Sequence, residues 1–217
     1  MRFGSAFIGG LLCCWIFVLP AKGSSPRRSD NKREPAYEKS QDDRSQSPAV
    51  VNAGRPKRSL KERIPDLVLL NQDGKKVNFY SDLIKGKIVI ISYFFTSCRL
   101  ICPMQGEAFA RLQSALGDRL GKDVFLISIT SDPIADTPER LKAWGAQFGA
   151  KPGWTLLTGD QKTVHSLLVL LTGAIPGTSE HRAIIFILND ETGAWLREYG
   201  MTAPERVLKE IDKTKEK

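Results

Sequence analysis

The chain has few of the side chains that bind soft metals or act as nucleophiles. Its 217 residues include four cysteines, two histidines and three methionines. Cys13 and Cys14 fall in an apolar N-terminal segment, so Cys98 and Cys102 are the one pair in the rest of the sequence. A structural zinc site takes four protein ligands, and this sequence offers too few of them to complete one. No internal repeat is visible either.

The N-terminus has the pattern of a secretory signal. An early positive charge, Arg2, precedes an apolar segment over residues 6–19, and the small residues Ala21 and Gly23 follow it. The apolar segment is shorter than the roughly 18 to 20 residues that a membrane-spanning helix needs. We therefore expect residues 1–23 to be a signal peptide or an uncleaved N-terminal anchor. The rest of the chain would then be extracytoplasmic: periplasmic, secreted, or anchored at the outer side of the inner membrane.

The positive charge of the chain is unevenly distributed. The formal net charge is +8, but residues 24–63 hold 11 Lys/Arg and 6 Asp/Glu, whereas residues 64–217 hold 19 and 18. A nearly neutral domain argues against nucleic-acid binding. Residues 24–61 are rich in Ser, Pro and charged side chains and have almost no apolar clusters, which predicts a disordered basic linker. Its charge also favours a membrane surface with anionic lipid head groups.

From residue 62 onward, apolar runs alternate with segments of helical spacing. The Asp73-Gly74 pair between two short runs predicts an N-terminal β-hairpin. Residues 87–95 lack polar alternation, which indicates a central strand covered on both faces. We expect strands at residues 67–70, 77–79, 87–95, 124–129, 154–157, 183–188 and 194–199, and helices at 104–116, 138–148, 161–171 and 204–211. This order predicts an α/β domain over residues 62–217, with a mixed sheet and a thioredoxin-like fold that carries an inserted βα unit.

The cysteine pair lies between the predicted central strand and a helix that Pro103 can open. Backbone N–H groups and the dipole at a helix N-terminus stabilise anions, so at least one thiol should ionise readily. In an exported protein, a structural disulfide is a common use of such a pair. Closing so short a loop stabilises a fold little, however, which favours a functional use of Cys98 and Cys102.

Both histidines are candidates for a third ligand. His165 lies in a predicted amphipathic helix, distant from the cysteines in chain order, and we expect it to be an ordinary surface or boundary residue. His181 precedes the predicted strand at residues 183–188, whose entry faces the cysteine loop in a thioredoxin-like fold. Two thiolates and one imidazole suit copper, as Cu(I) or Cu(II), better than zinc. Because ligation needs reduced, deprotonated cysteines, a disulfide should release the metal.

Three segments together resemble the Sco/SenC family. They are Phe94–Pro103 (FFTSCRLICP), Ser131–Glu139 (SDPIADTPE), and His181 ahead of an apolar strand. The resemblance covers roughly residues 62–212. It implies a thioredoxin-like fold, copper binding by the two cysteines and the histidine, and delivery of copper to the CuA site of cytochrome c oxidase or maintenance of that site in the reduced state. The implied partner is the CuA-bearing subunit or another copper or thiol protein.

Two positions depart from the pattern common in that family. Arg99 stands where members commonly have proline, and Glu180 stands where they commonly have aspartate. Arg99 places a cation beside the thiolates, which should lower their pKa but oppose a bound metal ion. Asp132, after the second central strand, is a candidate for the outer coordination shell or for a weak ligand. Asp136 and Thr137 fit a turn and a helix start instead.

Two classes of function remain open at this point. The first is a copper metallochaperone without turnover. The second is a thiol:disulfide oxidoreductase that reduces the cysteine pair of an exported partner, in which Cys98 and Cys102 would be catalytic. His181 separates them, because a pure dithiol reductase has little need of a histidine facing the sulfurs. A peroxidase fits less well, because the peroxiredoxin pattern puts cysteine three residues after threonine, where this chain has Arg99.

Overall fold

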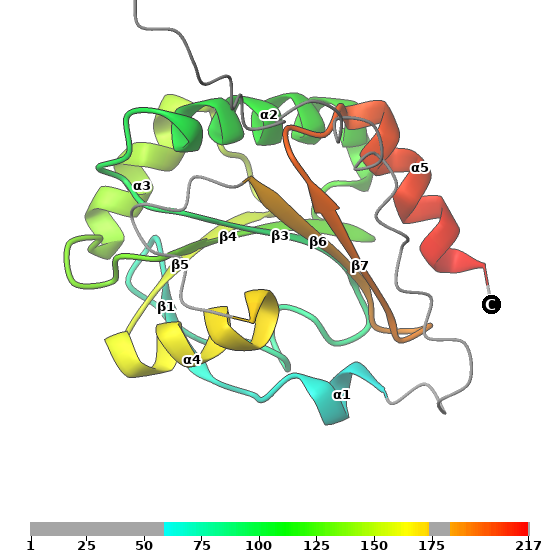
Figure 1. The fold of residues 1–217 in the computed structure, drawn as a ribbon, viewed down its shortest axis with the longest axis horizontal. Helices are drawn as coiled ribbons and strands as arrows, with labels where there is room; N and C mark the ends of the chain where they lie inside the picture. The colour runs from blue at the N-terminus through cyan, green and yellow to red at the C-terminus, as the bar shows by residue number, and fades with distance from the viewer. Residues whose placement is uncertain (1–58, 174–182, 217) are drawn as a thin grey trace, which may run out of the picture. The chain divides into compact units, whose positions relative to one another are not determined.

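The structure is a computed structural model that describes residues 59–173 and 183–216 (Figure 1). The expected signal or anchor and most of the expected linker lie outside the described residues, as do Glu180 and His181. All the described residues belong to one compact unit, assigned to residues 53–217. In this described part of the chain, none of the helices combines the length and the apolar character needed to cross a bilayer.

A mixed sheet forms the centre of the domain. Its strands are β1 (Val68–Asn71), β2 (Lys76–Asn78), β3 (Ile88–Phe94), β4 (Val124–Thr130), β5 (Trp154–Thr158), β6 (Ile184–Asn189) and β7 (Ala194–Tyr199). Their order in the sheet is β2-β1-β5-β4-β3-β6-β7. Strand β3 pairs in parallel with β4 and antiparallel with β6, so it is an interior strand of the sheet, as its apolar run predicted. The β1–β2 hairpin is also confirmed, and Gly74 takes the positive φ of 73° that its turn requires.

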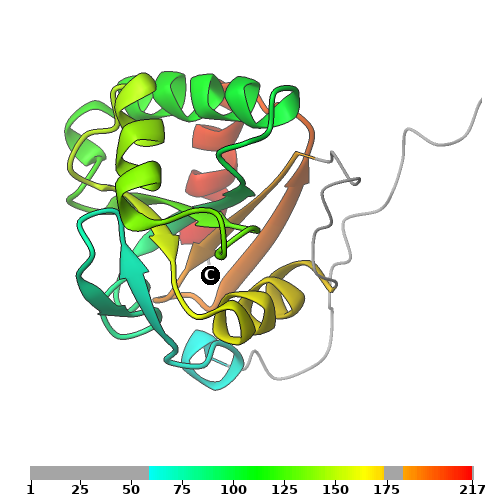
Figure 2. The ribbon, with the colours of Figure 1, turned by 90° about the vertical axis from the view of Figure 1, so that its left-hand side faces the viewer.

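Helices cover both faces of the sheet (Figures 1 and 2). They are α1 (Leu60–Arg63), α2 (Ile101–Leu116), α3 (Pro138–Gln147), α4 (Gln161–Thr172) and α5 (Pro204–Lys215), with a 3₁₀ turn at Gly117–Arg119. Helices α2, α3 and α5 lie on one face, and α1 and α4 lie on the other. The predicted α/β architecture and its element order are therefore confirmed.

Strand β3 contributes to two hydrophobic cores, which explains its lack of polar alternation. Val89 and Ile91 pack in the core on the α4 side, whereas Ile90 and Phe94 pack in the core under α2, α3 and α5. Ser92 is buried in β3, and its hydroxyl bonds the Ser128 hydroxyl of β4 at 3.0 Å. This bond satisfies the polar group and offsets the cost of its burial.

Several element boundaries differ from those expected from the sequence; helix α5, for example, ends at Lys215 rather than at residue 211. The fold begins before residue 62, because Leu60, which we placed in the linker, lies in α1 and is fully buried. A single helical turn is too short to show apolar periodicity. Helix α2 begins at Ile101, so Cys102 lies in its first turn and Pro103 is its third residue. Proline is tolerated there, because the N–H groups of the first turn have no acceptor within the helix.

Candidate functional site

The cysteine pair lies at the junction of β3 and α2. Cys98 is in the connecting loop, and Cys102 is in the first turn of the helix. Both are free thiols, and they are 7% and 3% exposed. Both side chains belong to the core under α2, α3 and α5. The structure thus places the pair at the strand-to-helix junction that the sequence predicted.

The start of α2 makes Cys98 the more acidic thiol. Burial opposes ionisation of Cys98, but hydrogen bonds from the backbone N–H groups of Cys102, Leu100 and Ile101, and from the Cys102 thiol, outweigh burial and lower the Cys98 pKa. These N–H groups open the helix and point their dipoles at the sulfur. Arg99, which we expected to lower this pKa, has an exposed side chain. The acidity of Cys98 follows from its place at the helix N-terminus.

Cys102 differs sharply from Cys98. Burial raises the pKa of Cys102 to about 12, and the nearby Cys98 and the Asp136 carboxylate shift it in the same direction. A hydrogen bond from the Phe95 backbone acts in the opposite sense but is too weak to cancel burial. The pair therefore offers one thiol that ionises readily and one that keeps its proton until a metal or an oxidant displaces it.

The buried carboxylate of Asp136 holds the cysteine loop against the neighbouring strand. Asp136 is fully buried and accepts hydrogen bonds from the Thr96 N–H (3.0 Å), the Thr96 hydroxyl (2.5 Å) and the Thr130 hydroxyl (2.6 Å). Thr96 opens the cysteine loop, and Thr130 ends β4. The sequence predicts only a turn residue at Asp136, and its role in holding the cysteine loop is an addition from the structure. The available signal was its place after β4, since parallel neighbouring strands end at the same edge of a sheet.

Asp132 makes its contacts within its own turn. Its carboxylate accepts a hydrogen bond from the Ala135 N–H at 3.3 Å, and its N–H donates to the Thr130 hydroxyl at 3.0 Å. A role in an outer coordination shell therefore stays a prediction. Thr137 caps α3 as expected, because its hydroxyl accepts a hydrogen bond from the Arg140 N–H at 3.4 Å.

The two predicted histidines have different outcomes. His165 is on α4, which covers the face of the sheet opposite α2, so the structure separates it from the cysteines (Figure 1). His181 lies outside the described residues. Strand β6 begins at Ile184 and runs antiparallel to β3, with Ile185 opposite Ser92. The chain therefore enters β6 at the end of the sheet that carries the cysteine loop. Within residues 59–173 and 183–216, no three His, Cys, Asp or Glu side chains cluster as metal ligands.

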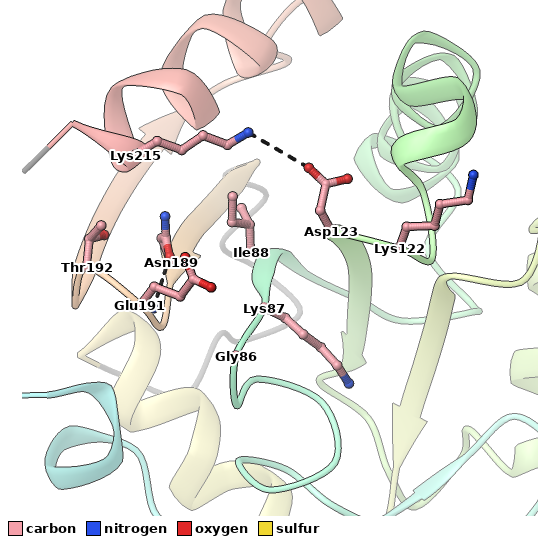
Figure 3. Close-up of a pocket in the computed structure, with 9 residues that line it drawn as sticks. All are labelled: Gly86, Lys87, Ile88, Lys122, Asp123, Asn189, Glu191, Thr192 and Lys215. Carbon is pink, nitrogen blue, oxygen red and sulfur yellow. Dashed lines mark hydrogen bonds and ion pairs between the residues drawn. The ribbon is translucent and has the colours of Figure 1, made fainter.

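A separate hollow of about 680 Å³ lies at the opposite end of the sheet (Figure 3). Its lining comprises Gly86, Lys87, Ile88, Lys122, Asp123, Asn189, Glu191, Thr192 and Lys215. Charges of both signs are present, and Lys215 pairs with Asp123 at 3.8 Å. The ammonium groups of Lys87 and Lys122 point away from each other (Figure 3). This lining offers no soft ligand and no convergent charge.

Comparison with known proteins adds sequence evidence. The family described as SCO1/SenC matches residues 56–215. A protein of Bacillus subtilis (strain 168), described as "SCO1 protein homolog", is 34% identical over 101 residues, which cover 46% of this chain and 51% of the relative. The chain thus spans about half the length of the curated relatives that it matches.

Solved structures have the same fold. Yeast Sco1 with copper bound superimposes with a TM-score of 0.59 at 22% identity, covering 76% of this chain and 96% of that one. BsSco, described as a member of the Sco family of cytochrome c oxidase assembly proteins with a disulfide switch, gives a TM-score of 0.57 at 25% identity, covering 70% and 96%. These likenesses confirm the thioredoxin-like fold class.

Proposed function

Because the chain belongs to the SCO1/SenC family, we propose that it binds copper through Cys98, Cys102 and His181 and delivers it to the CuA site during assembly of cytochrome c oxidase. The observation that carries this proposal is the pair of free, buried thiols at the end of β3 where the chain enters β6. Copper-bound yeast Sco1 and the assembly protein BsSco support it through the shared fold. The proposed location is extracytoplasmic, in the periplasm or at the outer side of the inner membrane.

The chemistry of the pair suits Cu(I). This ion accepts three soft or borderline ligands, here two sulfurs and one imidazole nitrogen. Cys98 supplies the first thiolate, because its pKa is lowered. Cys102 must lose its proton when the metal binds, since its pKa is raised to about 12 in the metal-free chain. Copper binding therefore releases protons, and copper affinity should rise with pH.

A second function, thiol:disulfide exchange, is favoured by the difference in acidity between the two cysteines. The Cys98 thiolate would attack a partner's disulfide, form a mixed disulfide and release one partner thiolate. Cys102 would then lose its proton and displace the second partner thiolate. This chain would be left with a Cys98–Cys102 disulfide and the partner with two reduced cysteines, so two electrons pass from this chain to the partner.

Metal analysis of the reduced full chain tests these functions. The chain is purified from copper-supplemented cells as the parent, His181→Ala, Cys98→Ser and His165→Ala, the last being the matched control. We expect about one copper in the parent and in His165→Ala, and strong loss in the other two variants, as three-ligand binding requires. Reduction of a disulfide substrate should survive His181→Ala and fail in Cys98→Ser. If His181→Ala retains copper as tightly as the parent, the ligand assignment is wrong. A copper-free parent that reduces disulfides supports the second function.

A further inference from the structure

Large apolar side chains are exposed around the cysteine loop. Leu100 is 67% exposed, Met104 is 54% exposed and Ile134 is 72% exposed. We call these three side chains the apolar collar. Single exposed apolar side chains are common on protein surfaces, but several at one place mark an interaction site.

The side chains of the collar come from two segments, the start of α2 and the loop between β4 and α3. Hydrogen bonds hold this loop next to the segment that leads into the cysteine loop. Leu100 is the N-cap residue of α2, and Met104 lies four positions later, in the first turns of the helix. Ile134 is in the loop between β4 and α3. That loop is fixed to the end of β3 by the hydrogen bond from the Ser131 N–H to the Phe94 carbonyl (2.7 Å). The hydrogen bonds that Thr96 donates to the Asp136 carboxylate fix it as well.

The sulfurs are recessed relative to the collar. Cys98 and Cys102 are 7% and 3% exposed, whereas each collar side chain is more than half exposed. Metal transfer between proteins requires that donor and acceptor ligands approach to bonding distance, about 2.3 Å for a metal–sulfur bond. A folded partner must therefore cover the collar to reach the sulfurs, whereas a small chelator has no such need.

Among the described residues of this surface, the charge is positive. Arg99 is exposed between Cys98 and Leu100, and no carboxylate of the described residues pairs with it. The nearest acidic groups in the adjoining loop are engaged: Asp136 is buried and hydrogen-bonded, and Asp132 binds its own turn. On α3, the cation Arg140 follows Glu139, which is hydrogen-bonded to Thr137. A partner carboxylate would complement Arg99.

We propose that the apolar collar and Arg99 form the docking surface for the copper-accepting protein, which presents apolar side chains and a carboxylate beside its own copper ligands. The proposal rests on the proposed function and adds to it the chemistry by which the recipient is recognised. Apolar contact would supply most of the affinity, and the Arg99 pair would supply orientation and rate of encounter.

Association with a defined acceptor tests the docking surface. The probe is the purified, copper-free CuA domain of cytochrome c oxidase from the same organism, titrated against the reduced full chain with and without copper. Met104→Asp and Ile134→Asp should each weaken association about tenfold or more, because they place a charge in the apolar contact. Leu170→Asp is the matched control on α4, where Leu170 is 40% exposed, and it should bind as the parent does. Arg99→Glu should weaken association and reduce its salt dependence, whereas Arg99→Lys should change it little.

Copper content and copper transfer to bathocuproine, a small chelator, are measured on the same preparations. Collar variants should keep the copper content of the parent and its transfer to the chelator. Equal association of the collar variants and Leu170→Asp would overturn the docking surface and leave copper binding intact. No association of the parent in either copper state would also overturn it. If the parent binds no copper, the proposed function is overturned. The docking surface is then still tested by the association of the copper-free parent and its variants with the CuA domain. Self-association that collar substitutions abolish would overturn the proposal in favour of a contact between copies.

Discussion

Thr96 donates two hydrogen bonds to the buried carboxylate of Asp136, one from its backbone N–H to Oδ2 (3.0 Å) and one from its hydroxyl to Oδ1 (2.5 Å). Thr96 lies two residues before Cys98, and Asp136 lies on the segment after β4. The pair therefore fixes the loop of the reactive thiol to the neighbouring parallel strand. A loop anchored in this way can present a sulfur in one position without relying on the sulfur itself for its structure.

Asp136→Ala should lower the free energy of unfolding by about 3 kcal/mol, because three donors lose a buried, charged acceptor. The measurement is urea unfolding of the reduced full chain. Asp132→Ala is the matched control, and it should cost less than about 1 kcal/mol, since Asp132 accepts one long hydrogen bond in its own turn. Equal losses for the two variants would show that the Asp136 hydrogen bonds do not hold the loop.

Alkylation by iodoacetamide should modify Cys98 before Cys102. The thiolate is the reactive form, so the lowered pKa of Cys98 puts the midpoint of its pH profile below that of an ordinary thiol. Cys102, with a pKa of about 12, should stay unmodified across the neutral and mildly alkaline range. Mass spectrometry after short pulses resolves the two sites, and the urea-unfolded chain is the control in which both react alike. Superimposable profiles in the folded chain would contradict the assignment.

Oxidation should release copper from the loaded chain. Diamide converts the two thiols into a disulfide, which leaves no thiolate to bind the metal, and dithiothreitol should restore binding. The measurement is the copper that co-elutes with the protein from a desalting column before and after each step. Cys98→Ser should not form the disulfide, and it should have little copper at either stage. Full retention of copper by a completely oxidised parent would exclude ligation by this pair.

Gly106→Ala should destabilise the domain although alanine favours helices. Gly106 is four residues after Cys102 on α2, and a Cβ there would lie 2.6 Å from Cε2 of the Phe148 ring. That ring packs against Trp144 with centroids 4.6 Å apart, which limits its retreat. Overpacking costs about 1–3 kcal/mol, and the gain in helix propensity offsets roughly 1 kcal/mol of that cost. We therefore expect a net loss of up to about 2 kcal/mol in urea unfolding. Adding Phe148→Leu should recover part of the loss, and a neutral Gly106→Ala would contradict this packing.

The parts of the fold predicted from sequence are those with a local signature. Strand β3 is buried on both faces and so needs an unbroken apolar run, and the β1–β2 turn needs a glycine at positive φ. The start of α3 was predicted because Thr137 and Pro138 suit a helix N-terminus. Leu60 was missed, since one helical turn carries no periodicity and its burial depends on distant partners.

The site was predictable in its residue types but not in its energetics. The spacing of Cys98 and Cys102 after an apolar run indicated a strand-to-helix junction, and the structure has one. Their opposite pKa shifts depend on which sulfur faces the helix N–H groups, and spacing does not reveal that. Asp136 was not recognised because a buried carboxylate and an exposed one look alike in a sequence. His181 remains a predicted ligand.

Helix α1 attaches the start of the domain at the end farthest from the thiols. The guanidinium of Arg63 lies 4.4 Å from the centroid of the Trp195 ring and donates to the Gly193 carbonyl at 3.4 Å, and both partners belong to the β6–β7 turn region. The cysteine loop is at the other end of the same sheet. If the N-terminus were attached to a bilayer, the attachment would enter the domain at the end of the sheet opposite the cysteine loop, and the thiols would lie at the far end.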